Sequence, residues 1–548
     1  MICQLRLWIE LLKNAYYIQG QTGVLETLPN IDINIKCGNS LISRFKLDAD
    51  LSDVFRSKRF SHQVYLITVE AYKSAKDKAA KDELKIFLSD IKKEFLSTVL
   101  NKHPYQKELS KLRADLVALD FTDLFGLKKM TEAETAAKKK SLQKQIDELD
   151  AKVNEYKNAT IYNNAFEWRF EFPEVLDGDG NYKGFDVVIG NPPYGRYLDV
   201  DPEVKKNLVA KNIYGPTGDI AEAMINLVLN GLTKPISSFS FIIPKGLSYV
   251  KSWEKTRIRL MENRLIEEII DTSRSFKEAA YEMMIFIATS NQQKPLYTGY
   301  IGEELLDKFE VARGLLNKNI FYFGFPEPYL SIVEKVKLNC KPISDYCQYW
   351  YGKGGMTPNV NKTGNGVKVL TGKEVQKYHQ KNIDDKWFID RSVLSEEDVR
   401  KSNLKKVVVQ DIVAHILNPK PHIKLTATID QENQFCFNTV MCFAGNDKID
   451  NRFILALVNS KFLSFFYYYF IFNQAIRTMH FMPGYADAMP VPTNYNEQQL
   501  PFIPLVDKIL AAKKENPQAD TSTWEKEIDV LVYELYGLTE EEVSMVER

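Results

Sequence analysis

One short stretch of the chain has the hydrophobic pattern of a β-strand and then stops abruptly. Residues 185–190, FDVVIG, are β-branched and apolar at every second position, which predicts a strand that ends at a glycine. Pro192 and Pro193 follow, and because they remove two successive backbone donors and fix φ, the chain must leave the strand there. Asn191 and Tyr194 are therefore expected at the carboxyl end of a strand, the edge where open α/β sheets bind ligands.

Helical periodicity accounts for much of the remaining chain. Residues 4–17 place apolar side chains on one face, and residues 46–160 combine charge with helical periodicity, which predicts a helical insertion between two strands. One face of this insertion is coiled-coil-like and brief; its residues are Leu142, Ile146, Leu149 and Val153. Further helices are expected over residues 219–232 and in the tail, where Gly537 stops the last one.

Three more runs, at 239–244, 266–271 and 283–288, are predicted strands of an α/β sheet. After Pro326 short strands, turns and glycines dominate, which predicts a second, α+β domain from about Ser331. Its glycines mark tight turns or close approaches of backbone to a ligand; they are Gly352, Gly354, Gly355, Gly364 and Gly366. The expected parts are an N-terminal remnant of the sheet domain (1–45), a helical insertion (46–160), the sheet region (161–295), a helical linker (296–330), the second domain (331–500) and a helical tail (501–548).

The composition adds few constraints. The chain is 45% hydrophobic and 26% charged, which is typical of a globular protein, and its formal net charge is zero, so any nucleic-acid binding requires a local basic face. The six cysteines form no CxxC pair and, with six histidines, offer no zinc spacing, so no metal is expected. The longest apolar run, residues 462–472, is too short to span a bilayer. We therefore expect a cytoplasmic protein with reduced thiols and no membrane segment.

The tetrapeptide from Asn191 to Tyr194 suits one chemical problem, the methylation of an amino or amide nitrogen whose lone pair is delocalised into a π-system. The Asn191 side-chain oxygen and the Pro192 carbonyl can accept hydrogen bonds from such a nitrogen and favour its sp3-like transition state. The Tyr194 ring can stack on the planar substrate, and no strong base is required. The alternative is a proline-rich turn that follows a core strand and has no chemical role.

This NPPY sequence resembles motif IV of the amino-group methyltransferases that use S-adenosylmethionine (SAM), as found in many adenine-N6 enzymes. The segments LRLWIELL, NIDINIKCGNSLI, FEWRFEFPEVL and IDVLVYELYGLTEEEV are similar to type IIG restriction–modification proteins with a Taq-type specificity domain. The resemblance implies an incomplete Rossmann-like methyltransferase sheet, SAM as cofactor, double-stranded DNA as partner, and an adenine flipped out of the duplex.

The resemblance also assigns residues. Asn39 matches the motif III position that contacts the SAM adenine, and a turn asparagine is the alternative. Phe276, with Tyr281 in reserve, lies where motif VIII places an aromatic ring on the other side of the flipped base, and core packing is the alternative. In the second domain, base contacts are expected from basic or amide side chains, against the alternative of solvated lysines; the candidates are Lys353, Asn359, Asn361, Lys362 and Lys373.

Two parts of the family pattern do not occur in this sequence. The family places a Gly-rich SAM loop and an acidic ribose-binding residue upstream of LRLWIELL, and no FxGxG-like loop occurs later in the chain. We therefore expect a fragment of an enzyme, or one half of a split enzyme whose separate N-terminal half carries the loop, with no catalysis by the chain alone. Two other readings stay open: a non-catalytic DNA-specificity partner, and a methyltransferase acting on protein glutamine, which also uses NPPY.

Overall fold

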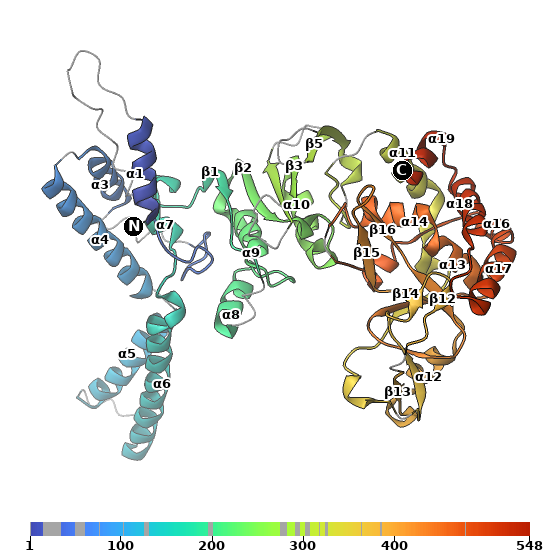
Figure 1. Cartoon of the computed structure of the whole chain (residues 1–548). Coiled ribbons are helices and arrows are strands. Elements are labelled where there is room, and N and C mark those ends of the chain that lie inside the picture. The colour runs from blue at the N-terminus through green and yellow to red at the C-terminus, as the bar shows by residue number, and fades with distance from the viewer. Residues whose placement is uncertain are drawn as a thin grey trace, which may run out of the picture. The chain divides into compact units, whose positions relative to one another are not determined.

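The computed structural model describes residues 2–14, 34–49, 61–75, 77–101, 104–124, 131–195, 201–273, 282–290, 296–301, 307–316, 318–323, 327–362, 364–383, 386–476 and 478–548. These residues form two compact units, 1–239 and 240–548 (Figure 1). The division falls inside strand β2 (Thr233–Pro244), which therefore contributes to both units.

Helices dominate the first part of the first unit. Their bounds are α1 Ile2–Asn14, α3 His62–Ser74, α4 Lys78–Asn101, α5 Pro104–Leu124 and α6 Glu132–Asn158. Thr131 begins α6 with a capping box, because its side chain accepts from the backbone of Glu134 while the Glu134 side chain accepts from the backbone of Thr131. The helices expected within residues 46–160 are confirmed, whereas their place between two strands stays a prediction.

Helices α5 and α6 form a hairpin whose apolar faces meet (Figure 1). Leu109 on α5 packs with Ile146, Leu149 and Val153 on α6, and all four side chains are buried. This is the face that the heptad-like spacing predicted. A separate apolar core joins α3 and α4 to residues 170–176, with Tyr65 and Phe95 in edge-to-face contact at 5.9 Å.

The strand predicted from FDVVIG is present as β1, Phe185–Gly190. It is followed by α8 (Pro202–Ala210), α9 (Ile220–Leu227) and β2. Gly184 directly precedes β1. A Cβ at this position would lie 2.6 Å from the Thr233 carbonyl carbon at the start of β2. Only glycine therefore allows the two strands to begin side by side.

The sheet is mixed and has the strand order β1-β2-β4-β3-β5-β6. The remaining strands are β3 Leu265–Ser273, β4 Met283–Thr289, β5 Leu296–Ile301 and β6 Asp307–Ala312, with α10 (Glu254–Asn263) before β3. Strand β3 runs antiparallel to β4 and parallel to β5. The three strands predicted between 239 and 288 are thus confirmed: β4 begins at its expected residue, β3 one residue earlier than expected and β2 six residues earlier.

The helical linker predicted over 296–330 is wrong. Its first half forms β5 and β6, which pair antiparallel with each other, and helix α11 (Glu327–Asn339) begins only at its end. Apolar residues alternate in β6, at Phe309 and Val311, but not in β5, so partners in the sheet rather than local propensity decide the conformation of these segments.

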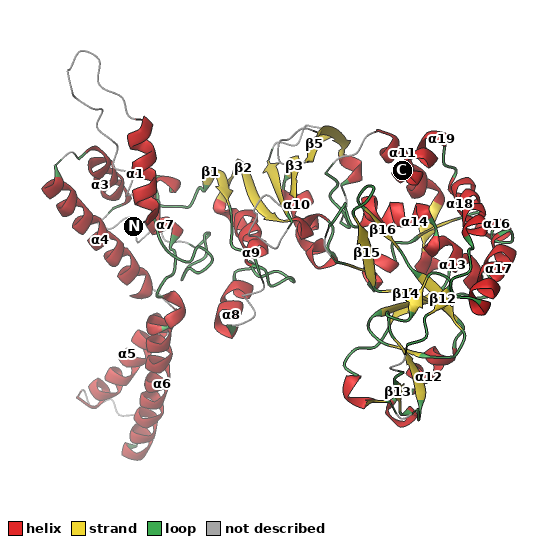
Figure 2. Ribbon diagram, in the orientation of Figure 1, coloured by secondary structure: helices red, strands yellow, loops and turns green. Residues whose placement is uncertain are grey.

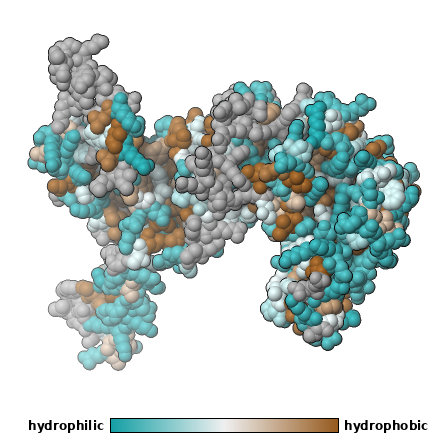
Figure 3. Space-filling view, in the orientation of Figure 1, coloured by the Kyte–Doolittle hydropathy of each residue, from teal (hydrophilic) through white to brown (hydrophobic). Residues whose placement is uncertain are grey.

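At the other side of the sheet, β1 is an edge strand with exposed apolar side chains. Val187 is 66% exposed and Ile189 is 81% exposed. Figure 3 shows hydrophobic patches among hydrophilic surface on the first unit. Edge strands of this kind are usually shortened, charged or covered, because they can pair with another chain.

The second domain of the sequence prediction folds as small sheets with helices around them (Figure 2). One sheet has the order β17-β14-β19-β8 and another β18-β10-β13-β9. The strands are β8 Gln348–Tyr351, β9 Val360–Asn361, β10 Val367–Leu370, β13 Phe388–Ile389, β14 Lys406–Gln410, β17 Ala427–Asp430, β18 Phe435–Cys436 and β19 Val440–Ala444. Strand β14 is buried between antiparallel partners, which explains its continuous valine run.

Smaller pairings complete this part of the chain. They join β7 Cys340–Pro342 to β21 Pro490–Pro492, β11 Val375–Gln376 to β12 His379–Gln380, and β15 Ile412–Ile416 to β16 His422–Lys424 and β20 Met479–His480. The helices are α12 Glu396–Asn403, α13 Asn451–Asn459, α14 Lys461–Phe466, α17 Phe502–Glu515, α18 Ser522–Tyr536 and α19 Glu540–Glu547. Helix α18 ends at Gly537, whose φ of 65° is the left-handed cap that the sequence predicted.

Among the described helices, no single one is long and apolar enough to cross a membrane. The helices 451–459 and 461–471, which are bent relative to each other by 58°, are together long and apolar enough.

Candidate functional site

The NPPY loop follows β1 as predicted, and its two candidate site residues, Asn191 and Tyr194, contact each other. The Tyr194 hydroxyl donates a hydrogen bond to Asn191 Oδ1 over 2.8 Å. Asn191 and Pro193 are exposed, Pro192 is buried and Tyr194 is half-buried. An anchored proline thus holds an amide oxygen and an aromatic ring at the surface of the unit.

Helix α9 fixes the far end of this loop. Asp219 begins the helix, since its Oδ1 accepts from the Ala221 backbone over 2.8 Å, and its Oδ2 accepts from the Gly195 backbone over 3.1 Å. The Ile220 amide donates in turn to the Gly195 carbonyl. Gly195 has a φ of 123°, a conformation that L side chains rarely adopt, so the turn out of the NPPY loop requires glycine.

A buried carboxylate shapes the approach to α9. Glu222 is fully buried, and its Oε2 accepts from both the backbone and the hydroxyl of Thr217. A Cβ at Gly215 would lie 2.0 Å from the Glu222 carboxyl carbon. The segment before α9 therefore folds around this carboxylate, which places Asp219 for its two contacts.

Asn39, the expected SAM contact, occupies a turn. Its Oδ1 accepts from the Leu41 backbone over 3.2 Å, its carbonyl accepts from Ile42, and no described strand precedes it. The next residue, Ser40, contacts helix α9: its hydroxyl lies 3.6 Å from the Met224 sulfur. Asp219 and Met224 are five positions apart, about 7 Å along a helix. The structure thus brings the Asn39 turn and the NPPY loop to the same helix.

Two half-buried groups of opposite charge, Glu167 and Lys211, lie behind the Asn39 turn. Burial raises the pKa of Glu167 to about 7, although its Oε1 accepts from the Arg44 backbone. Burial lowers the pKa of Lys211 to about 8, and Lys211 donates to the backbone and the hydroxyl of Ser43. These contacts hold residues 43–45 against the α8–α9 region.

The aromatic candidates Phe276 and Tyr281 lie outside the described residues. Among the described residues, the sequence analysis missed a buried charge cluster. Lys245 Nζ lies 2.6 Å from Asp271 Oδ2 and 3.8 Å from Glu282 Oε2, and each of the three side chains is at most 5% exposed. These residues lie at the ends of β2, β3 and β4. The charged residue at one end of each apolar run could therefore have predicted the cluster from the sequence.

This cluster also holds a later segment of the chain. Lys245 Nζ donates to the Gln474 carbonyl over 3.3 Å, and Glu282 Oε1 accepts from the Ile476 backbone over 2.8 Å. The buried Asn473 amide donates to the Ser248 hydroxyl and to the Phe321 carbonyl, both over 2.9 Å. Residues 473–476 are thereby fixed, within the second unit, to the edge of the sheet where β2 and β3 end and β4 begins.

Four of the five predicted DNA-contacting residues lie in one segment, 353–362, and the fifth, Lys373, is also exposed. Lys353 forms an ion pair with Asp398 at 2.6 Å, and the Asn361 amide donates to the Asn365 carbonyl over 3.3 Å. Asn359 and Lys362 are exposed. Contact of these five residues with DNA bases stays a prediction.

The glycines of this segment approach backbone of the same chain. A Cβ at Gly352 would lie 1.8 Å from the Phe437 carbonyl oxygen, and one at Gly366 would lie 2.2 Å from the Ile389 carbonyl oxygen. At these two positions the close approach is to backbone of a neighbouring strand or turn. The approach to a ligand that the sequence analysis offered stays a prediction.

The described residues supply only part of a SAM site. The Asn39 oxygen is engaged in its own turn. The exposed edge beside the NPPY loop carries the apolar Val187 and Ile189 side chains rather than a donor for the SAM carboxylate or an acceptor for its ribose hydroxyls. This arrangement offers an acceptor and a stacking surface for a substrate, but it does not by itself fit the cofactor.

Comparison with known proteins assigns the class and the family. A methylase followed by a specificity domain defines the modification part of a restriction–modification enzyme. The family model described as Eco57I restriction-modification methylase matches residues 1–277, just over half of the chain, and the model of the TaqI-like C-terminal specificity domain matches residues 367–491. The chain therefore belongs to the Eco57I restriction–modification methylase family and carries a TaqI-like specificity domain, which confirms the resemblance found in the sequence.

Individual relatives are more distant. The Methanocaldococcus jannaschii protein RM.MjaORFECS2P, named for a type II restriction enzyme and methyltransferase, is 25% identical over 377 residues, which cover 63% of this chain and 30% of that protein. The crystal structure of the type IIG restriction endonuclease BpuSI is 13% identical, with coverage of 72% and 62% and a TM-score of 0.28. The DrdV–DNA complex is 11% identical, with coverage of 69% and 52% and a TM-score of 0.28. The chain thus spans under a third of its curated relative.

Proposed function

We propose that this chain is the target-base and specificity part of a DNA adenine-N6 methyltransferase in a restriction–modification or phage-defence system. The family implies SAM-dependent methylation, and the TaqI-like domain implies DNA as the substrate. The observation that carries the proposal is the pair Asn191 and Tyr194, joined at 2.8 Å on an anchored loop at the carboxyl end of β1.

Each residue of the loop has a defined role in this reaction. Asn191 Oδ1 and the Pro192 carbonyl accept hydrogen bonds from the adenine amino group, which favours pyramidal geometry at its nitrogen as the new bond forms. The Tyr194 ring stacks on the base, and Pro193 keeps the loop extended. SAM supplies the methyl group when it is bound by the complete site.

The amino group of a stacked, paired adenine cannot reach such a loop, so the base must leave the duplex. Flipping costs a few kcal/mol, and stacking on aromatic side chains contributes roughly 1–3 kcal/mol per base in return. In this proposal Tyr194 provides one face of the slot, and Phe276 or Tyr281 provides the other.

A second candidate is a DNA-specificity partner with no catalysis of its own. The incomplete fit to SAM and the exposed β1 edge favour it over glutamine methylation, and a specificity domain has no evident use in a glutamine methyltransferase.

Radiolabelled methyl transfer separates these functions. The chain is incubated with labelled SAM and mixed-sequence duplex DNA, alone and with a polypeptide that carries the family's Gly-rich loop, and the DNA is digested to identify the labelled nucleoside. We expect N6-methyladenine only in the complemented reaction. Label in protein glutamine, or on cytosine, would contradict the proposal, and DNA binding without transfer in the complemented reaction would support the non-catalytic partner.

A further inference from the structure

A small three-stranded sheet in the second unit has one buried face and one exposed face. Its strand order is β16-β15-β20, and the buried face consists of Val413, Ile423 and Met479, each at most 4% exposed. Side chains at the alternate positions form the other face, which we call the β15 face. All of them are exposed; they are Ile412, Ala414, Lys424, Thr478 and His480. The β15 face thus combines side chains from three segments of the chain.

The strand register places these side chains next to one another. Ile412 pairs with His480, and Ala414 pairs with Lys424. Opposite residues of antiparallel strands share a face, with their Cβ atoms roughly 4.5–5.5 Å apart. The face therefore carries a histidine and a lysine on either side of two short or apolar side chains.

A buried carboxylate orients the histidine. The His480 Nδ1 atom lies 2.5 Å from Asp411 Oδ2, and the Asp411 side chain is 3% exposed whereas that of His480 is 46% exposed. An ionised carboxylate only accepts hydrogen bonds, so Nδ1 carries the proton in this pair. Within the described part of the chain, Nε2 has no hydrogen-bond partner. Asp411 thus fixes the ring and leaves Nε2 available to a ligand.

Buried groups hold the segment that carries His480 at both of its ends. The Phe481 backbone donates to the Asp411 carbonyl over 2.7 Å, and the Ile476 backbone donates to Glu282 Oε1 over 2.8 Å. A side chain on a segment fixed in this way loses little freedom when it binds. His480 is therefore positioned before any ligand arrives.

The segments that build the β15 face contain no carboxylate. Residues 412–429 and 473–486 include neither Asp nor Glu, although the whole chain has a formal net charge of zero. Lys420, in the turn before β16, and Lys424 are both exposed, and neither forms an ion pair with any residue that the structure describes. A neutral chain needs such a local basic face to bind nucleic acid. The face also lies inside residues 367–491, the TaqI-like specificity domain.

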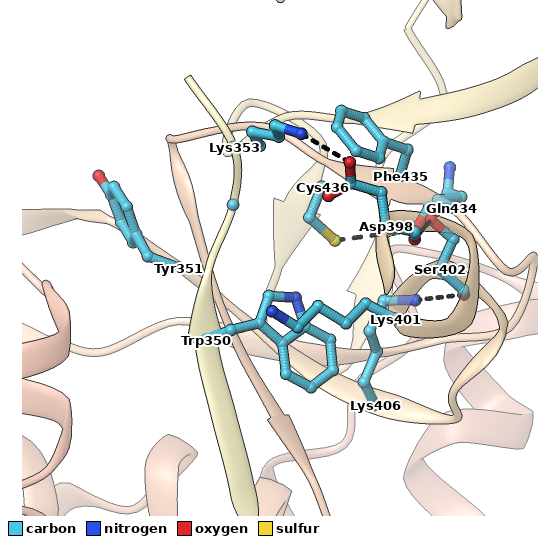
Figure 4. Close-up of a pocket in the computed structure, with 11 residues that line it drawn as sticks. Trp350, Tyr351, Lys353, Asp398, Lys401, Ser402, Lys406, Gln434, Phe435 and Cys436 are labelled. Carbon is cyan, nitrogen blue, oxygen red and sulfur yellow. Dashed lines mark hydrogen bonds and ion pairs between the residues drawn. The ribbon is translucent and has the colours of Figure 1, made fainter. Parts of the chain in front are cut away.

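The pocket between β8 and α12 differs in its charges (Figure 4). Lys353 pairs there with Asp398 at 2.6 Å, and the buried Lys406 pairs with Asp430 at 2.5 Å. The Gln434 amide has no partner among the described residues, but it is buried and offers no surface to a ligand. A phosphate in this pocket would compete with carboxylates, whereas a phosphate at Lys424 would not.

We propose that the β15 face binds duplex DNA, with Lys424 at a phosphate and His480, oriented by Asp411, at the edge of a base. This inference rests on the proposed function in taking DNA as the ligand, and it adds a contact surface to the candidates within 353–373. A β-ribbon fits the major groove, and small apolar side chains such as Ala414 contact the thymine methyl group there.

The binding test uses the full chain and fluorescence anisotropy with a mixed-sequence duplex. Ala414→Glu adds a carboxylate at an exposed position, so it should lower duplex affinity at least tenfold by repelling phosphates while the urea unfolding midpoint stays unchanged. The matched control is Ala511→Glu, at an exposed position of α17, which changes the net charge equally and should keep the affinity within twofold. An equal loss in both variants, or no loss in Ala414→Glu, would overturn the proposal.

Salt dependence tests the phosphate contact. Lys424→Ala should weaken binding and reduce the slope of log affinity against log salt by about 1, as expected for the loss of one phosphate contact. Lys508→Ala, which removes an exposed lysine of α17, is the control and should keep the slope of the parent. A slope unchanged in Lys424→Ala would contradict the assignment of this lysine to a phosphate.

Target choice tests the base contact. In the complemented methylation reaction, His480→Ala should relax the preference at one position of the target sequence, whereas Lys424→Ala should leave the target unchanged. His480→Ala leaves the buried Asp411 without its partner, so the double variant Asp411→Asn/His480→Ala, which also removes the buried charge, is measured beside it. Both should relax the same position. A target unchanged in both would contradict the role of His480.

The parent chain separates this inference from the proposed function. If the parent does not bind duplex DNA, the proposed function and the inference both fail. If the parent binds duplex DNA and the affinity is unchanged in both Ala414→Glu and Lys424→Ala, only the inference fails, because the DNA surface then lies elsewhere on the chain.

Discussion

The Tyr194 hydroxyl donates its hydrogen bond to Asn191 Oδ1, the oxygen that the proposed reaction needs as an acceptor. The bond joins residues three positions apart and lies near the surface, where a net contribution of about 0.5–1.5 kcal/mol is typical. An incoming amino group can therefore displace the hydroxyl at modest cost. Until then the bond holds the amide and the ring in a defined arrangement.

The first prediction concerns this pair in the complemented enzyme. Asn191→Ala should lower methyl transfer by about 100-fold or more, because the lost acceptor acts mainly in the transition state, and DNA affinity should stay within a few-fold. Tyr194→Phe is the matched control: it keeps the ring and removes only the hydroxyl, so transfer should stay within a few-fold of the parent. Near-normal turnover by Asn191→Ala would show that the acceptor role is mistaken.

The second prediction concerns SAM. The chain alone should not bind SAM stoichiometrically in a calorimetric titration, because the Asn39 oxygen is engaged and the described residues hold no complete cofactor site. The exposed β1 edge should also make the chain self-associate as its concentration rises, which sedimentation velocity detects. Tight, one-to-one SAM binding by a monomer would disprove the need for a complementing polypeptide.

The third prediction assigns sequence choice to residues 331–500. Exchanging this segment for that of a relative with a known target should transfer the target sequence if, as proposed, its amide and lysine side chains supply the base contacts. Sequencing of methylated adenines in the complemented reaction gives the answer. An unchanged target would place specificity elsewhere in the chain.

The fourth prediction tests the buried charge cluster. Lys245→Met leaves the buried Asp271 and Glu282 without their cation and should cost about 3–5 kcal/mol in urea unfolding. Lys251→Met removes a lysine that is 56% exposed and paired with Glu254, so it should cost less than about 1 kcal/mol. Equal effects would mean that the cluster contributes no more than a surface pair.

The fifth prediction is a pH dependence. Burial raises the pKa of Glu167 from 4.5 to about 7, so the folded chain holds a proton that the unfolded chain has lost between these values. Its stabilising contribution is fully present below about pH 4.5 and is lost as the pH rises through about 7. Glu167→Gln should therefore match the parent near pH 4.5 and exceed it at pH 8 by at most about 3 kcal/mol, since one pKa unit is roughly 1.4 kcal/mol.

Urea unfolding of both chains from pH 4.5 to pH 8 provides the measurement. The lowered pKa of Lys211, about 8, changes stability only at higher pH, where stability should rise toward pH 10.5. Parallel curves for the parent and Glu167→Gln between pH 4.5 and pH 8 would contradict the assignment.

Local pattern was sufficient to predict several elements. Strand β1, the NPPY loop and the α6 face with Ile146 and Val153 follow from spacing over a few residues, and each is present. Residues 296–312 were mistaken for a helical linker because β5 depends on a parallel neighbour, β3, which is distant in sequence. Sequence pattern carries no information about such a partner.

The buried polar groups were missed for a related reason. Lys245, Asp271 and Glu282 are separated in sequence, and only strand order brings their side chains together. The Gln434 amide is unusual only because its surroundings leave it unpaired, which no single-residue property reveals. The hydrogen bond between Tyr194 and Asn191 could have been predicted from the sequence, because the two residues are three positions apart on a loop that two prolines stiffen.

Asp219 uses one carboxylate for two purposes, with Oδ1 on the first turn of α9 and Oδ2 on Gly195 of the NPPY loop. Fraying of that helix end and release of the loop are consequently one event. On gentle heating, activity of the complemented enzyme should therefore fade several degrees before the bulk of the chain melts. The temperature of inactivation would then measure the stability of the two Asp219 hydrogen bonds rather than the global stability of the chain.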